Sequence, residues 1–246
     1  MTPDTIKAFQ AHAELCYPRE SCGVVLMFEG AEIYKPCHNI AEAEDHFAIC
    51  PIDYANAEDM GEITHIVHSH PAVAPIPSEA DRVGCTASGL PWVIVNWPTG
   101  NWAEYQPDGY VAPLLGREFA YGVLDCYTLI QDYYKRACGI RLPDFEHQAH
   151  FWKQGVPLYE MNYEQAGFYV VDTPQQHDML ILMVGATIAN HGVIYLGNGT
   201  ILHHLMNRLS TVDVYGGYFQ KVTVKILRHK EIGTAPAITP EAACAL

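Results

Sequence analysis

Two histidines and an aspartate stand close together in the segment HIVHSHPAVAPIPSEADR, residues 65–82. His68 and His70 are separated by one residue, and ten residues lie between His70 and Asp81. Side chains on a strand alternate between its faces, so both imidazoles point the same way if this segment is extended. With the carboxylate they form a three-residue ligand set for zinc, which keeps a fourth position open for water. The predicted site is therefore catalytic, because zinc lowers the pKa of bound water to about 7 and polarises a carbonyl.

Part of this set has a simpler interpretation. Ser78 and Asp81 also form the S-x-x-[DE] pattern of a capping box, which starts a helix after Pro77. Either residue alone is more often a helix cap than a catalyst, and a lone HxH pair is weak evidence for a metal site. The complete set is much more specific than its parts.

That complete set resembles the JAMM (MPN-type) metalloprotease motif, in which an upstream glutamate is followed by HSHP and then by SxxD. Here HSHP occupies residues 68–71, PSEAD occupies 77–81, and the upstream glutamate is Glu20 in CYPRESCGVVL. The likeness covers roughly residues 1–105. Members of the family cut isopeptide or peptide bonds.

The resemblance also implies a role for each residue. His68, His70 and Asp81 would bind Zn2+. Glu20 would be the general base on the zinc-bound water, and Ser78 would steady the tetrahedral oxyanion.

A second candidate site starts at Cys126, where LDC is predicted to open a helix. The positive end of the helix dipole stabilises a thiolate, which predicts a nucleophile at neutral pH. The hairpin HGVIYLGNGTILHH offers a base, because His191 and His203 lie on its two arms. A nucleophile, a histidine base and a polar residue that orients the base are the parts of a papain-like hydrolase. A single cysteine in a helix is usually a small core residue, so the ordered set carries the argument.

The order DCYTLI, HGVIYLGNG and a further histidine resembles the NlpC-type cysteine peptidases of bacterial cell-wall metabolism, and the likeness spans roughly residues 112–230. The family pattern is close to DCSGLV, then HVGIYLGNG, then a second histidine. The resemblance implies that Cys126 is the nucleophile, His191 the base and His203 the orienting residue. The sequence departs from the family after the cysteine, where Tyr127 and Thr128 replace Ser-Gly.

Two details of this site are left open by the residues. The family's tyrosine falls on Phe119, with Tyr121 close by. A three-residue loop centred on Gly197 would put His203 opposite His191, whereas a slip of one residue would bring His204 round instead. Spacing favours His203. Asp125 is interpreted as a charge at the helix N-terminus rather than a catalytic acid.

The elements that must position these residues fall into two groups. In the first, helices are predicted at 2–16, 51–60 and 78–89, and strands at 21–28, 31–37, 63–70 and 91–97. This alternation is typical of an α/β unit. In the second, a helix at 124–139 and a partly helical stretch at 144–170 precede strands at 179–184, 191–197, 200–206 and 221–229, an α+β plan.

The predicted domains follow from these groups and from the two resemblances. The first is a JAMM/MPN metalloprotease domain with a cytidine deaminase-like α/β fold, at 1–106. A Pro/Gly-rich linker is expected at 107–116. The second is a papain-like NlpC-type α+β cysteine peptidase domain at 117–233, followed by a disordered Ala/Pro-rich tail at 234–246.

Composition limits the partners and the location. The 246 residues carry a net charge of -14, which disfavours nucleic acid and anionic membrane surfaces as partners. No apolar stretch approaches 18 residues, so membrane insertion is not expected. The N-terminus lacks the pattern of a signal peptide, and the eight cysteines include no CxxC pair, which favours reduced thiols in a cytosolic protein.

The pairing of the two domains resembles tail proteins of lambdoid tailed phages. The resemblance implies a protein made in the host cytoplasm, with phage tail tip proteins as partners and a possible place in the virion tail tip. Bacterial peptidoglycan would be the substrate of the cysteine domain during cell-wall penetration, through cleavage of stem-peptide bonds. Two alternatives are a scaffold or chaperone of tail assembly, and a protease that matures a tail protein.

Overall fold

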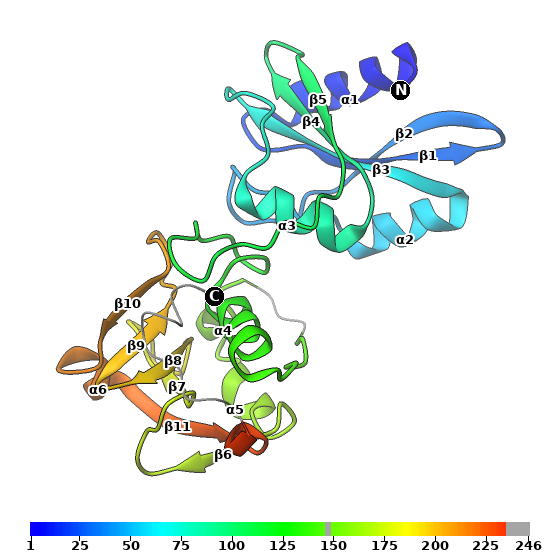
Figure 1. Cartoon of the computed structure of the whole chain (residues 1–246). Coiled ribbons are helices and arrows are strands. Elements are labelled where there is room, and N and C mark those ends of the chain that lie inside the picture. The colour runs from blue at the N-terminus through cyan, green and yellow to red at the C-terminus, as the bar shows by residue number, and fades with distance from the viewer. Residues whose placement is uncertain (146–148, 235–246) are drawn as a thin grey trace. The chain divides into compact units, whose positions relative to one another are not determined.

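The computed structural model describes residues 1–145 and 149–234. The chain forms two compact units, Met1–Val111 and the residues from Ala112 onward, each built around its own sheet (Figure 1). The expected tail at 234–246 lies outside the described residues from 235 on.

The segment expected to be a linker is packed at both ends. Tyr110 OH donates to Glu79 Oε1 at 2.7 Å, and the Arg82 guanidinium lies 3.8 Å from the centroid of the Tyr110 ring. Further along, Ala112 is buried, and Leu114 belongs to the core of the second unit. The chain therefore passes from one unit to the next around residue 111.

The first unit has three helices and a five-stranded sheet. The helices are α1 (Pro3–Cys16), α2 (Pro51–Met60) and α3 (Glu79–Ser88). The strands are β1 (Cys22–Phe28), β2 (Ala31–Cys37), β3 (Glu62–Pro71), β4 (Trp92–Trp97) and β5 (Trp102–Tyr105), in the order β2-β1-β3-β4-β5. Neighbours are antiparallel except β3 and β4, which run parallel. The predicted helices and strands are confirmed, and β5 was not predicted.

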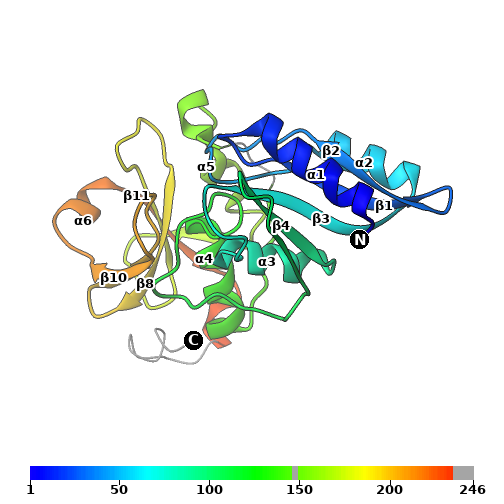
Figure 2. The ribbon, with the colours of Figure 1, turned by 90° about the horizontal axis from the view of Figure 1, so that it is seen from above.

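Helices cover both faces of this sheet. Helix α1 packs Phe9 against Val67 on one face, and Figure 2 shows it running lengthwise beside the strands. On the other face, Ala57 of α2 and Cys85 of α3 pack with Ile66 of β3. His68 and His70 have the same parity as Ile66, so they lie on the face that α2 and α3 cover.

The second unit places most of its helices before an antiparallel sheet. Its helices are α4 (Cys126–Tyr133), a π-helical turn (Tyr134–Cys138), a 3-10 turn (Phe151–Gln154), α5 (Leu158–Asn162), α6 (Tyr218–Val222) and a last 3-10 turn (Ile232–Thr234). Its strands are β6 (Phe168–Val171), β7 (Met179–Leu182), β8 (His191–Gly197), β9 (Thr200–His203), β10 (Thr211–Val214) and β11 (Thr223–His229). The strand order is β10-β9-β8-β7-β11-β6.

Helix α4 and helix α6 pack on opposite faces of this second sheet. Ile130 of α4 shares a core cluster with Ile194 of β8, whereas Phe219 of α6 packs with Val193. The α/β plus α+β fold class predicted from the sequence is thereby confirmed. The short strands β6 and β10 were not predicted, and the predicted helix at 124–139 winds into a π-helical turn at Tyr134.

The hairpin between β8 and β9 has a register different from the predicted one. Asn198 and Gly199 form a two-residue turn with φ of 51° and 72°, as a type I′ turn requires. A register shift between Tyr195 and Gly197 absorbs one residue, and Ile194 then pairs with Leu202. The expectation of a three-residue loop with His203 directly opposite His191 is wrong. By this register His203 lies opposite Val193, on the same face as His191 and diagonal to it.

Within residues 1–145 and 149–234, no helix has the length and apolar character needed to cross a membrane. The seven cysteines of these ranges are all free thiols. Cys244 lies outside them.

Gly192 allows β8 to approach α4 and α5 closely. A Cβ atom at this position would lie 2.7 Å from Ile130 Cδ1 and 3.1 Å from Tyr159 OH. Contacts this short require a shift of packed side chains, so the position demands a residue without a side chain.

We therefore expect Gly192→Ala to destabilise the second unit by about 1–3 kcal/mol through overpacking. Differential scanning calorimetry measures the change as a lower unfolding temperature. Gly216→Ala is the matched control, because its Cβ would lie 3.7 Å from Val214 Cγ1, an ordinary contact. Equal unfolding temperatures for the two variants would contradict the packing argument.

Two candidate active sites

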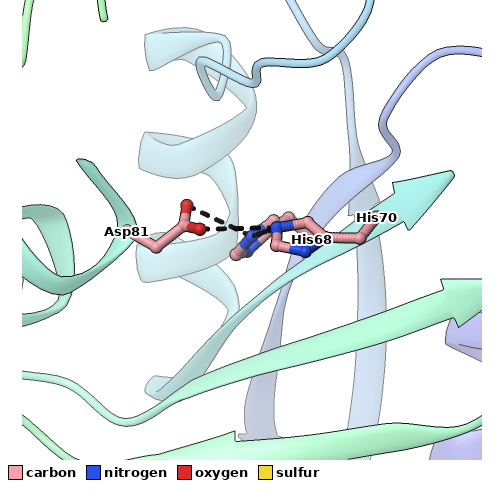
Figure 3. A group of neighbouring side chains, drawn as sticks. All are labelled: His68, His70 and Asp81. Atoms are coloured by element: carbon pink, nitrogen blue, oxygen red, sulfur yellow. Dashed lines mark hydrogen bonds and ion pairs between the residues drawn. The ribbon is translucent and has the colours of Figure 1, made fainter. Parts of the chain in front are cut away.

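The three predicted zinc ligands meet between β3 and α3 (Figure 3). His68 Nε2 lies 3.1 Å from His70 Nε2, and the Asp81 carboxylate oxygens lie 3.3 Å and 3.4 Å from these two nitrogens. All three residues are buried. The structure thus brings together a compact set of two imidazoles and one carboxylate.

This set fits a zinc ion on its own geometry. Zinc bonds of 2.0–2.2 Å in a tetrahedron put neighbouring ligand atoms about 3.3 Å apart. The three separations between the ligand groups of His68, His70 and Asp81, 3.1–3.4 Å, bracket that value. Two nitrogens and one oxygen are also a donor set that zinc accepts in catalytic sites.

Neighbouring groups orient the two histidines. His70 Nδ1 donates to the Ala74 carbonyl at 3.3 Å, which leaves the lone pair of Nε2 directed at the site. The His68 ring stacks on Phe47 with centroids 4.4 Å apart and meets Trp92 edge-on at 5.5 Å. Burial lowers the pKa of His68 below its usual value, so this imidazole is neutral, as a metal ligand must be.

Asp81 is positioned by the capping box that starts α3. Ser78 Oγ donates to Asp81 Oδ2 at 2.8 Å and accepts from the Asp81 amide, and the Ser78 amide donates to the same carboxylate oxygen. The helix-cap interpretation of Ser78 and Asp81 is therefore correct, and it is compatible with a metal site. The same hydrogen bonds aim the carboxylate at the two histidines.

Glu20 lies at the edge of this site, with Oε1 3.9 Å from His70 Nε2. It is placed there by Ser21 and Ser69, since the Ser21 amide donates to Ser69 Oγ and the Ser69 amide donates to the Ser21 carbonyl. These bonds join the start of β1 to the middle of HSHP. Burial, with a smaller contribution from the charge of Asp81, raises the pKa of Glu20 to about 9.

Cys126 is the first residue of α4, which starts two residues later than the predicted helix at 124–139, and Asp125 is the N-cap. The Asp125 carboxylate accepts from the amides of Tyr127 and Thr128, and Thr128 Oγ1 accepts from the Asp125 amide. The expectation that the helix end stabilises a thiolate at neutral pH is wrong. Burial, followed by the charge of Asp125, raises the pKa of Cys126 to about 11.

Tyr159 lies next to the Cys126 thiol, and the sequence analysis did not predict this contact. Its OH lies 3.4 Å from Cys126 Sγ, and burial raises the pKa of Tyr159 well above its usual value, so the hydroxyl stays protonated. Tyr159 lies in α5, within the stretch 144–170 that has no clear periodicity. No pattern in the sequence indicated its place beside the cysteine.

Cys126 and His191 line one cavity of about 380 Å³, whose other walls include the aromatic side chains of Tyr127, Trp152 and Tyr159. Among the hydrogen bonds of the described residues, none joins Cys126 to His191. Burial, with the nearby His203 and His204 adding to it, lowers the pKa of His191 to about 3. At neutral pH the two residues are therefore a thiol and a neutral imidazole.

The alternatives His203 and His204 occupy different environments. The His203 ring meets the His191 ring edge-on with centroids 5.7 Å apart, and its Nε2 contacts Asp213 Oδ2 at 2.9 Å. The His204 ring instead meets Phe119 at 5.1 Å and lines the cavity. This geometry favours His203 as the partner of His191. Asp213, on the unpredicted strand β10, was missed by sequence analysis.

The fold and the two sites define a class of protein with a JAB-type unit followed by an NlpC/P60-type unit. Residues 2–107 match the family described as prokaryotic homologs of the JAB domain, and residues 116–228 match the NlpC/P60 family. A solved JAB1/MPN domain protein from Archaeoglobus fulgidus is 24% identical, with a TM-score of 0.30, over 43% of this chain and 86% of that chain.

Two curated relatives place the chain more narrowly. It is 43% identical over 236 residues to tail tip assembly protein K of Escherichia phage N15, which covers 94% of this chain and 97% of that protein. It is 40% identical over 182 residues to tail tip assembly protein K of Escherichia phage lambda, covering 73% and 88%. The chain belongs to the tail tip assembly protein K family. The resemblance to lambdoid tail proteins stated from the sequence is thereby confirmed.

The raised pKa of Cys126 predicts how its alkylation depends on pH. A thiol with a pKa of about 11 gains thiolate as the pH rises, about tenfold per unit below the pKa. We expect the rate of Cys126 alkylation by iodoacetamide, followed by mass spectrometry of its peptide, to rise throughout pH 6–9. A plateau that already begins near pH 5 would instead indicate a preformed thiolate–imidazolium pair.

Proposed function

We propose that this chain acts in phage tail tip assembly and carries two peptidase sites, of which the cysteine site cuts the peptide stems of bacterial peptidoglycan. The observation that carries the proposal is the cavity that Cys126 and His191 line together at the start of α4. Support also comes from the match to the NlpC/P60 family and from the names of the relatives in phages N15 and lambda.

In the proposed reaction, Cys126 Sγ attacks the carbonyl carbon of the scissile bond while His191 accepts the thiol proton. His191 then returns this proton to the leaving amine, and water releases the acyl group from the sulfur. The hydroxyl of Tyr159, always protonated and 3.4 Å from Cys126 Sγ, donates to charge that develops beside the sulfur. His203 orients His191.

The proposed substrate bond is a γ-D-glutamyl linkage of the stem peptide, as the resemblance to the family implies. Aromatic side chains on the cavity wall can pack against the alkyl parts of such a peptide. Among the described lining residues, Arg208 is the one with a permanent positive charge. Its charge is complementary to the carboxylates of a murein stem.

For the first unit, we infer that His68, His70 and Asp81 hold zinc and that the site cuts a peptide or isopeptide bond. Zinc, when bound, supplies a water of lowered pKa and polarises the substrate carbonyl. Glu20 is the proposed general base, and a nearby dication would favour its ionised form over the protonated one. Ser78 is the proposed contact for the oxyanion: its single O–H would turn from Asp81 Oδ2 to the oxyanion, while the Ser78 amide keeps its hydrogen bond to that carboxylate oxygen.

The partners and location follow the same proposal. The chain would be made in the host cytoplasm, join phage tail tip proteins during assembly, and act from the virion tail tip. Murein is itself anionic, and the net charge of -14 gives the chain no general attraction to it. Delivery to the wall would therefore depend on the tail partners.

The zinc assignment predicts the binding of one equivalent of Zn2+ by the full chain, measured by isothermal titration calorimetry. His68→Ala removes a ligand, and we expect a loss of affinity of at least about 100-fold, since loss of outer-shell partners already costs about 10–100-fold. His65→Ala is the control on the same strand. His65 Nε2 faces Glu104 at 3.8 Å, away from the site. The His65→Ala variant should therefore bind Zn2+ with the affinity of the unaltered chain.

The peptidase assignment is tested on isolated bacterial sacculi. We expect the full chain to release fragments cut within the stem peptide, identified by mass spectrometry, because Cys126 and His191 share a substrate-sized cavity. Cys126→Ala should abolish the release. Cys138→Ala is the matched control, because this thiol of the same unit contacts His177 at 3.7 Å and has no part in the proposed site.

The outcomes of this assay separate the alternatives. Fragments that persist with Cys126→Ala but disappear with His68→Ala would transfer the murein activity to the zinc site. Intact sacculi, with zinc and a reductant present, would contradict the murein proposal. Comparing tail assembly and tail-protein masses between the unaltered chain and both variants would then distinguish a scaffold from a maturation protease.

A further inference from the structure

Asp213 reaches the cysteine site from the outermost strand of the second sheet. Strand β10 pairs with β9 in a register that puts Thr211 opposite His203 and Asp213 opposite Ile201. Asp213 is thus the diagonal neighbour of His203 on the same face. Its Oδ2 lies 2.9 Å from His203 Nε2, a hydrogen bond between a buried ring and a carboxylate that is about one-third exposed.

This contact fixes which nitrogen of His203 carries the proton. An ionised carboxylate can only accept, so His203 Nε2 must be the donor. Burial lowers the pKa of His203, despite the opposing effect of Asp213, and the ring is therefore neutral with a single N–H. It follows that Nδ1 of His203 carries a lone pair and can act only as an acceptor.

One nitrogen of His203 and one nitrogen of His191 could form a hydrogen bond with each other. His203 Nδ1 and His191 Nε2 are both buried, and neither has a hydrogen-bond partner within the described parts of the chain. The two rings are nearly perpendicular, at 73°, with centroids 5.7 Å apart. A buried nitrogen without a hydrogen-bond partner costs free energy. If His191 carries its proton on Nε2, a small ring movement would let it donate to His203 Nδ1, and both nitrogens would then have a partner.

We propose that Asp213 is a positioning residue of the cysteine site: it holds His203 as the Nε2–H tautomer, so that His203 Nδ1 accepts a hydrogen bond from His191 Nε2–H. This inference rests on the proposed function of Cys126 and His191. His191 then keeps its Nδ1 lone pair for the proton that leaves Cys126 Sγ. The order of the relay is Cys126, His191, His203 and Asp213, and one proton moves, from sulfur to His191.

The neighbours of Asp213 show which variants can serve as controls. Arg208 Nη2 lies 3.9 Å from Asp213 Oδ2, and its guanidinium opposes protonation of His203. Val214, the next residue of β10, is 73% exposed and makes no part of the relay. Substitution of Asp213, on an outer strand and partly exposed, removes no core side chain, so the variants should fold.

The test is the tautomer of His203 in the full chain, read from 15N chemical shifts of histidine-labelled protein and assigned with His203→Gln. We expect Nε2–H in the unaltered chain, in Val214→Ala and in Asp213→Asn, whose amide oxygen still accepts. Asp213→Ala should lose this preference. Retention of the Nε2–H tautomer in Asp213→Ala would overturn the proposal.

Turnover of a synthetic stem peptide provides the second readout. We expect kcat to fall about tenfold in Asp213→Ala with little change in KM, as for loss of an outer partner of a functional histidine, and to recover largely in Asp213→Asn. A changed tautomer with unchanged kcat would also overturn the proposal. If the unaltered chain cuts no stem peptide, the murein function fails, whereas the tautomer result still decides whether Asp213 controls His203.

Discussion

Both candidate sites depend on a capping box that starts a helix beside a histidine-bearing strand. In the first unit, Ser78 accepts from the amide of Asp81 and donates to its carboxylate, so the bonds that begin α3 also orient a candidate metal ligand. In the second, Asp125 and Thr128 begin α4 and leave Cys126 as its first residue. A helix start is a rigid point in the chain, because its free amides need partners and its backbone is regular from there on. The two units differ in fold, yet each uses a capping box at a helix start to position a candidate site residue.

Burial then decides the protonation states that the capping boxes leave open. It lowers the pKa of His68 and of His191, so both imidazoles are neutral and their lone pairs are available. In the metal site this neutrality is what a ligand needs. In the cysteine site it accompanies a thiol whose pKa is raised to about 11, so the resting pair carries no charge. The helix dipole stabilises a thiolate by at most about 2 kcal/mol. This is too small to offset the free-energy cost of removing the thiolate charge from water.

The sequence predicted what depends on local pattern and missed what depends on long-range pairing. The clustering of His68, His70 and Asp81 could be predicted because HSHP on a strand and SxxD at a helix start are each contiguous, and the place of Cys126 because it lies at a predicted helix start. Tyr159 was missed because it is 33 residues from the thiol, in a stretch without periodicity. Asp213 was missed because TVDV is too short to be recognised as a strand, and its contact with His203 depends on that strand pairing at the edge of the sheet. The predicted register of the β8–β9 hairpin was wrong, because a bulge between Tyr195 and Gly197 follows from the two-residue turn at Asn198–Gly199 and the alternation of residue types does not reveal it.

The two sites also differ in how completely the folded chain assembles them. The candidate zinc ligands already lie 3.1–3.4 Å apart, held by Ala74, Phe47 and the α3 cap, so little reorganisation would be needed for a cation to bind. In the cysteine site the outer contact of His203 is formed, whereas its inner nitrogen and that of His191 await a partner among the described residues. Hydrogen bonds of catalytic groups are often long before substrate binds and tighten afterwards. Under the proposed function, a peptide that fills the cavity beside Cys126 and excludes water would supply that tightening, and substrate binding and activation of the thiol would then be a single event.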